Sequence, residues 1–206
     1  MNASLKETNK SEDRQDWVAV TSKLAREFAE RASAYDEEGS FVHENYADLR
    51  DFKLFSVGIP VELGGGGAAY ADICHIIQEL GRHCGSTGLT YAMHSHPVAV
   101  NVLKYRNGDE QAKAALTKIA ANELIIAGTG ANDWLASSGD AVATDDGFVV
   151  NAHKRFVSGG PAADLFVTSA QFDGPDGMEV LHFAVPFKTD GIAIQSNWNT
   201  HGMRGT

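Results

Sequence analysis

The stretch EQAKAALTKIAANELIIAGTG, residues 110–130, contains the point at which the chain changes from helical to strand character. Its first half, 110–121, has high helix propensity, and its apolar residues recur on one side of the expected helix. Its second half contains Leu124 to Gly128, a short apolar run that is typical of a buried strand. The sequence therefore predicts two domains, residues 1–121 and 122–206, that meet near residue 122.

Upstream of this point, apolar residues recur at helical spacing. Trp17, Val20, Leu24 and Phe28 fall three or four residues apart, which predicts an amphipathic helix with Ser11 or Asp13 as its N-cap. Further helices are expected over 44–52, 70–80 and 89–105, and Pro97 is expected to kink or break the last of these. The first domain is predicted to be entirely helical.

Downstream of residue 122, short apolar runs are separated by turns rich in Asp, Gly and Pro. Strands are expected at 124–128, 147–151, 155–158, 165–170, 179–187 and 191–194. Because no helical pattern alternates with these runs, we expect an antiparallel β-barrel or sandwich and not a doubly wound α/β fold. The predicted fold class is α+β, with a helical domain followed by a β-domain that is truncated near its end.

Charge and composition narrow the function. The net charge of −10 in 206 residues disfavours nonspecific nucleic-acid binding and anionic membrane surfaces. The chain has neither a run of 18 apolar residues nor an apolar N-terminal segment, so a cytoplasmic location is expected. Cys74 and Cys84 are too few for a disulfide framework and are interpreted as reduced thiols.

Several motifs, in order, connect the chain to a known family. Gly58 to Gly67 forms a turn that ends in four glycines, and Asn107 to Lys113 forms a helix start of the type Asn-Gly-Asp-Glu-Gln-Ala-Lys. Phe148 to Gly160 reads FVVNAHKRFVSGG, Ala163-Asp164 follows, and the chain ends in Gly-Met-Arg-Gly-Thr at 202–206. In their joint order and spacing these motifs resemble the acyl-CoA dehydrogenase family across about residues 45–206.

One segment departs from the family pattern. The family opens its β-domain with a Thr/Ser-Glu-Pro motif, whereas Thr129 to Asp140 reads TGANDWLASSGD and lacks the Glu-Pro pair. Thr129 is the expected flavin-contacting residue, with Ala131 as the alternative register. Position 152 is alanine where the family has glycine.

The resemblance implies a flavoenzyme that binds FAD against its β-domain. By this resemblance, Phe156 covers the flavin ring, Val157 offers backbone contacts and Ser158 donates a hydrogen bond near flavin N5. Gly128, Thr129 and Gly130 are expected at the pyrimidine edge, because glycines allow the backbone to approach a planar ring closely.

Substrate-binding residues are also implied. Tyr91 and His94 fall where the family lines its acyl pocket, and Ser137 and Ser138 are expected to contact either the CoA phosphopantetheine or the flavin phosphates. A helical histidine is more often a core residue, and Ser-Ser-Gly-Asp is also an ordinary turn. The pair His94 and His96 does not predict a metal site, because residues two apart point to different faces of a helix.

No catalytic residue is assigned within this sequence. In most of the family the base is a glutamate on a C-terminal helical bundle, and this third domain is expected to be absent here. The expected function is α,β-dehydrogenation of an acyl-CoA thioester, with an electron-transfer flavoprotein as acceptor and a homo-oligomer when complete. The alternatives are a flavin-dependent monooxygenase of the same fold, which the altered Glu-Pro region and the His94-Ser95-His96 segment favour, and a noncatalytic fragment that needs a partner chain to hold FAD.

Overall fold

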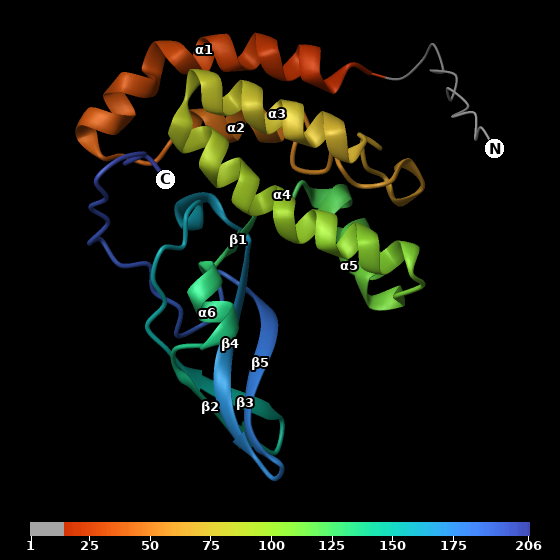
Figure 1. The fold of residues 1–206 in the computed structure, drawn as a ribbon, viewed down its shortest axis with the longest axis vertical. Helices are drawn as coiled ribbons and strands as arrows, with labels where there is room; N and C mark the ends of the chain where they lie inside the picture. The colour runs from red at the N-terminus through yellow and green to blue at the C-terminus, as the bar shows by residue number, and fades with distance from the viewer. Residues whose placement is uncertain (1–14) are drawn as a thin grey trace, which may run out of the picture.

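A helical layer lies on one side of the molecule and a β-domain extends from it (Figure 1). The computed structural model describes residues 15–206, apart from the side chain of Asn132, so the predicted caps Ser11 and Asp13 lie outside the described residues. The helices of the first domain are α1 (Trp17–Glu38), α2 (His43–Asp51), α3 (Tyr70–His83), α4 (Gly85–Arg106) and α5 (Glu110–Asn122). A 3-10 turn, η1 (Val61–Leu63), connects α2 to α3 through the glycine-rich segment. The predicted helical domain is confirmed.

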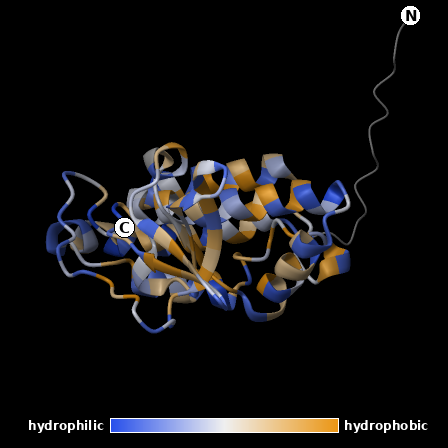
Figure 2. Ribbon diagram, turned by 90° about the horizontal axis from the view of Figure 1, so that it is seen from below, coloured by the Kyte–Doolittle hydropathy of each residue, from blue (hydrophilic) through white to orange (hydrophobic). Residues whose placement is uncertain are grey.

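The helices form where the apolar stripes predicted them. Asp16 caps α1 by accepting a hydrogen bond from Ala19 N at 3.0 Å, and Asp109 caps α5 in the same way from Gln111 N at 2.9 Å. Figure 2 shows apolar and polar residues alternating along these helices, as expected when one face of each helix is buried. Pro97 was predicted to kink or break the helix that contains it. No break occurs, because α4 continues through Pro97 from Gly85 to Arg106.

The glycine-rich turn is built by close backbone contacts. A Cβ on Gly65 would lie 2.3 Å from the Ile59 carbonyl oxygen, and one on Gly66 would lie 2.7 Å from the Trp17 ring. The Trp17 indole N–H donates to the Gly66 carbonyl at 3.1 Å. The turn therefore packs on the start of α1, and only residues without a side chain fit there.

The β-domain contains one mixed sheet and a short helix. Its strands are β1 (Ile126–Gly128), β2 (Asp140–Thr144), β3 (Gly147–Asn151), β4 (Leu165–Gly174) and β5 (Gly177–Pro186), and the helix α6 (Ala131–Leu135) follows β1. β4 pairs in parallel with β1 and β2 and antiparallel with β5, while β2 and β3 form an antiparallel hairpin. The predicted antiparallel barrel or sandwich is therefore corrected to an open, mixed sheet.

Two of the expected strands are wrong and one is new. Residues 155–158 form no strand, because Phe156 has a φ of 59°, which a strand cannot accommodate. Residues 191–194 are also irregular. Strand β2 was not predicted, because its apolar run is only three residues long, two of them alanines, and is flanked by polar Asp140 and Thr144; its partner β3 was predicted. The segment Gly160–Ala162, after this loop, forms the 3-10 turn η2.

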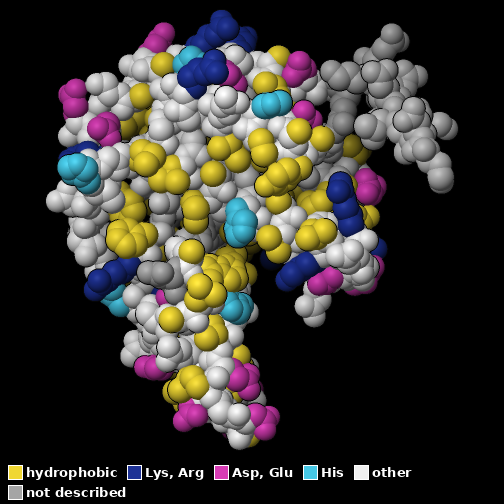
Figure 3. Space-filling view, in the orientation of Figure 1, with side chains coloured by type: hydrophobic (Ala, Val, Ile, Leu, Met, Phe, Trp, Pro, Cys, Tyr) yellow, Lys and Arg dark blue, Asp and Glu magenta, His cyan; other side chains and the backbone are white. Residues whose placement is uncertain are grey.

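Two hydrophobic clusters organise the molecule. The larger is formed mainly by the helical domain, with Phe28, Leu49 and Ile76, and also includes Ile125 from the start of the second domain. The smaller joins the domains, because Val98 and Leu116 of the helices pack with Ile126 of β1. Figure 3 shows hydrophobic side chains gathered over the helices and the adjoining part of the β-domain. The distal β2–β3 hairpin instead leaves apolar side chains exposed, with Val142 at 63% and Val149 at 62%.

Candidate functional site

The end of strand β1 places Thr129 in the interior. Thr129 N donates to the Val167 carbonyl at 3.3 Å, and the Trp134 indole donates to the Thr129 carbonyl at 3.2 Å. The side chain is only 2% exposed, and its hydroxyl has no hydrogen-bond partner among the described residues. The Thr129 hydroxyl lies near enough to the Asp133 carboxylate to lower its pKa, but no hydrogen bond of ordinary geometry joins the two groups. A buried hydroxyl without a partner is an uncommon feature that a ligand could satisfy.

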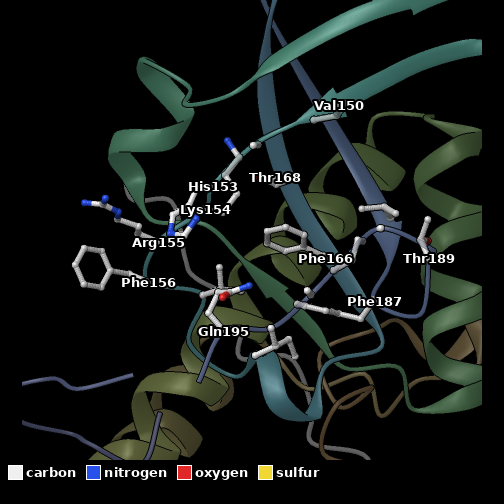
Figure 4. Close-up of a pocket in the computed structure, with 18 of the residues that line it drawn as sticks. Val150, His153, Lys154, Arg155, Phe156, Phe166, Thr168, Phe187, Thr189 and Gln195 are labelled. Carbon is white, nitrogen blue, oxygen red and sulfur yellow. The ribbon is translucent and has the colours of Figure 1, made fainter. Parts of the chain in front are cut away.

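The loop after β3 places Phe156 on the surface. Its side chain is 68% exposed and its backbone has a φ of 59°, a conformation that costs a bulky residue free energy. Val157 and Ser158 are half-buried, and the loop then reaches the helical domain at Gly159, where a Cβ would lie 3.4 Å from the Tyr46 hydroxyl. Figure 4 shows the Phe156 ring pointing away from Phe166.

A buried polar network connects these two segments. The Lys154 ammonium lies 2.7 Å from an Asp133 carboxylate oxygen, 2.6 Å from the Ser138 carbonyl and 3.2 Å from the Ser137 hydroxyl. The side chains of Lys154 and Asp133 are 7% and 13% exposed. Burial by itself would raise the pKa of Asp133, but the hydrogen bonds from Lys154 and Ser138 hold that pKa below its usual range.

The network occupies both predicted substrate-binding serines. Ser138 donates its backbone N–H and its hydroxyl to Asp133 at 3.0 and 2.8 Å. The Ser137 hydroxyl lies 2.9 Å from the Ser169 hydroxyl of β4, and Gln171 donates to the Ser137 carbonyl at 2.7 Å. Because Lys154 is an ammonium paired with a carboxylate, it has no lone pair to accept the Ser137 proton. The arrangement is therefore unsuited to nucleophilic catalysis by serine.

Tyr91 and His94 lie in the core and not on an open surface. The side chains of Tyr91 and His94 are each 1% exposed. The Tyr91 hydroxyl donates to the Leu54 carbonyl at 2.7 Å. His94 Nδ1 accepts from Ile126 N at 3.1 Å, so its Nε2 carries the proton and donates to the Phe55 carbonyl at 2.8 Å. Burial lowers the pKa of His94 to about 4, against a smaller opposing effect of the hydrogen bond to Phe55. His94 joins α4 to β1, and its role in substrate binding stays a prediction.

A cavity of about 1290 Å³ lies between one face of the sheet and the irregular segment 189–200. Phe156 and Val157 are among its lining residues, whereas Ser158 and the segment 128–130 are not. Phe166 and Phe187 contribute aromatic rings 5.1 Å apart, and the buried Thr168 hydroxyl has no partner among the described residues. Thr168 could not be selected from the sequence, because the orientation of its side chain depends on the pairing of β4.

The structure brings together part of the predicted site. The segments 129–135 and 152–158 are joined by Asp133 and Lys154, neither of which was predicted as a site residue. Lys154 stands two positions before Phe156, inside the quoted motif, whereas nothing in the sequence marks Asp133 as its partner. Within residues 15–206, no group of three or more His, Cys, Asp or Glu side chains is arranged to hold a metal ion.

Comparison with known proteins identifies the family. Residues 11–123 match the model of the acyl-CoA dehydrogenase N-terminal domain, and residues 128–206 match that of the acyl-CoA dehydrogenase middle domain. The chain therefore belongs to the acyl-CoA dehydrogenase family, and the proteins it resembles are flavin-dependent dehydrogenases and monooxygenases, which are enzymes.

Individual relatives fall into both groups. The chain is 26% identical over 188 residues to a probable acyl-CoA dehydrogenase, YngJ, of Bacillus subtilis, covering 88% of this chain and 49% of that protein. It is 30% identical over 200 residues to dibenzothiophene monooxygenase of Rhodococcus qingshengii, covering 93% of this chain and 47% of that protein. The chain thus spans about half the length of the curated relatives it matches.

A solved structure has the same fold. FMN-bound dibenzothiophene monooxygenase TdsC from Paenibacillus sp. A11-2 superposes with a TM-score of 0.80 at 21% identity, over 92% of this chain and 48% of that one. At this identity the likeness defines the fold alone. Among the described residues, no helix combines the length and the apolar character needed to cross a bilayer.

Proposed function

We propose that this chain forms the flavin-binding wall of a flavin-dependent oxidoreductase. The observation that carries the proposal is the exposed Phe156, held at a φ of 59° by the loop after β3. Such a backbone persists only when its surroundings impose it, and strained residues concentrate at ligand sites. The cavity on the face of the sheet supports the same proposal, because Phe156 and Val157 are among its lining residues.

The residues of the chain would bind and orient the cofactor. Phe156 would lie against the ring, Ser158 would donate a hydrogen bond to it, and the backbone of Gly128 to Gly130 would approach its edge. A bound flavin supplies either acceptance of a hydride from substrate or, when reduced, reaction with O₂. FAD was expected from the family, and because TdsC binds FMN, both flavins are candidates here.

We favour monooxygenation of a small organic substrate as the reaction. The segment that lacks the Glu-Pro pair forms α6, whose Asp133 is committed to Lys154. This local structure differs from the motif expected of an acyl-CoA dehydrogenase. In this case a reductase that supplies reduced flavin replaces the electron-transfer flavoprotein as partner.

Dehydrogenation of an acyl-CoA thioester is the second candidate. The likeness to the probable acyl-CoA dehydrogenase YngJ over 88% of the chain favours it. The catalytic base, a homo-oligomeric state and a cytoplasmic location remain predictions from the family resemblance and the composition.

Flavin binding and turnover test the proposal. The purified protein is titrated with FMN and FAD by fluorescence, and is then assayed with reduced flavin and O₂ in parallel with acyl-CoA and an artificial electron acceptor. We expect binding of at least one flavin and oxygen-dependent turnover of an aromatic sulfur compound or a similar small molecule. Acceptor reduction by acyl-CoA without oxygen consumption would favour the second candidate, and binding of neither flavin would refute both.

Replacing Phe156 by glycine separates flavin contact from folding. Because glycine adopts a positive φ without strain, Phe156→Gly should leave the free energy of unfolding equal or up to about 1 kcal/mol higher. The same change should weaken flavin binding about tenfold, since the ring contact is lost. Chemical denaturation and flavin titration measure the two effects. Glycine at Val142, an exposed residue of β2 that is not among the residues lining the cavity, should leave flavin affinity unchanged.

A further inference from the structure

We propose that the buried ion pair between Asp133 and Lys154 is a positioning device for the flavin site. It would set flavin affinity by holding the segments 129–135 and 152–158 in register, without contacting the flavin itself. This inference rests on the proposed function, because both segments are assigned to the flavin by that proposal.

Lys154 connects the loop after β3 to three acceptors. Its ammonium reaches the Asp133 carboxylate, the Ser138 carbonyl and the Ser137 hydroxyl at 2.7, 2.6 and 3.2 Å. These three contacts satisfy the three donors of an ammonium group. Since Lys154 precedes Phe156 by two residues, fixing the ammonium restricts the path of the backbone that places the Phe156 ring.

Asp133 connects α6 to the same point. One carboxylate oxygen accepts from the backbone and hydroxyl of Ser138, and the other accepts from Lys154. The Asp133 carbonyl accepts from the Ser169 hydroxyl of β4 at 2.6 Å, so α6 is held on the sheet from both its main chain and its side chain. The helix follows directly after Thr129 and Gly130, whose positions it therefore fixes.

The burial of the pair makes it a coupled unit. With side chains 7% and 13% exposed, each charge is largely shielded from water and would regain only part of its hydration if the other were removed. Removing one partner of a buried ion pair leaves an uncompensated charge, whereas removing both leaves none. The β2–β3 hairpin already brings the two segments close by pairing Asp140 with Asn151, and the ion pair adds a contact between charged side chains that fixes α6 against the loop after β3.

A double-mutant cycle on flavin affinity tests the inference. Asp133→Asn and Lys154→Met are made singly and together in the purified protein, and each variant is titrated with FMN and FAD. Each single change should weaken flavin binding about tenfold or more, and the double variant should bind no worse than the weaker-binding single variant but still less tightly than the wild type. The visible circular dichroism of bound flavin should change in all three, because it reports the surroundings of the ring.

The exposed pair Lys113 and Glu110 of α5, 3.1 Å apart, gives the matched control. Lys113→Gln and Glu110→Gln should change neither the affinity nor the dichroism. Loss of thermal stability in the Asp133 and Lys154 variants, with wild-type flavin affinity and dichroism, would show a merely structural role and overturn the inference. Additive effects of the two substitutions on the free energy of flavin binding would also overturn the inference.

If a single variant fails to fold, the double variant still tests the inference. The double variant leaves no buried charge unpaired, and wild-type flavin affinity in this variant would refute the positioning role. If the unaltered protein binds no flavin, the proposed function falls and this inference with it. If the unaltered protein binds flavin but the Asp133 and Lys154 variants bind it equally well, only this inference is refuted and the proposed function stands.

Discussion

At the scale of single residues, the two domains meet at a histidine with a fixed tautomer. His94 donates to the Phe55 carbonyl and accepts from the Ile126 amide, so both ring nitrogens are hydrogen-bonded to the backbone of other segments. The sequence placed His94 on a helix but could not distinguish a pocket residue from a core residue. That distinction depends on which backbone groups of distant segments face the ring.

The titration of His94 should make the protein less stable in mild acid. Its pKa is lowered from 6.5 to about 4 in the folded state, so below pH 6.5 the unfolded chain binds a proton that the folded chain does not. The free energy of unfolding should therefore fall by about 3 kcal/mol as the pH decreases from 6.5 to 4.

Chemical denaturation as a function of pH measures this effect. His94→Gln keeps one donor and one acceptor without titrating, so its profile should lack the decrease between these pH values. His201→Gln, at an exposed histidine, should keep the wild-type profile. Identical profiles for wild type and His94→Gln would refute the assignment of this loss of stability to His94.

At the scale of elements, helices α3 and α4 cross through a glycine contact. A Cβ on Gly88 of α4 would lie 2.6 Å from the Gly81 Cα and 2.7 Å from the Gly81 nitrogen. A Cβ on Gly81 itself would meet nothing within 4 Å. The periodicity of each helix was readable in the sequence, but which of the two glycines is required depends on the crossing of the helices.

The two glycines should respond in opposite directions to alanine. Gly88→Ala forces the two backbones apart and should lower the free energy of unfolding by about 1–3 kcal/mol. Gly81→Ala gains helix propensity at an open position and should raise it by up to about 1 kcal/mol. Urea denaturation of both variants measures the difference, and equal effects would show that the helices do not cross in this way.

The strands also show that local sequence patterns predict an element without deciding how the chain folds around it. Strands β3, β4 and β5 were predicted because their apolar runs are bounded by Gly and Asp turns. The run at 155–158 contains the β-favouring pair Phe156 and Val157, yet it forms a loop because Phe156 adopts a positive φ. Local pattern could not show this, since the conformation is imposed by Lys154 on one side and by Gly159 against the helical domain on the other.

At the scale of the whole molecule, an ion pair and a shared core join the domains. Arg50 of α2 lies 2.7 Å from the Asp164 carboxylate before β4, and the same carboxylate oxygen accepts from Ile125 N at 2.8 Å. Asp164 belongs to the Ala-Asp pair of the family resemblance. The structure shows the physical use of this residue, which is to tie α2 to the backbone before β1.

Two substitutions of Asp164 should separate its charge from its acceptor role. Asp164→Asn removes the ion pair, which is partly exposed, and should cost no more than about 1 kcal/mol. Asp164→Ala also leaves Ile125 N without an acceptor and should cost about 1–3 kcal/mol more. Hydrogen exchange at the Ile125 amide should accelerate in the alanine variant only, and equal exchange in both variants would contradict this role.

The sequence by itself determined the two domains, the helices and most of the strands, because periodicity and turn residues are local properties. Family motifs also marked the loop around Phe156. Only the tertiary structure decided that the sheet is mixed and open, that Tyr91 and His94 are buried, and that Ser137 and Ser138 belong to a network around Asp133 and Lys154. These features depend on contacts between residues far apart in the chain, and such contacts leave no regular spacing in a single sequence.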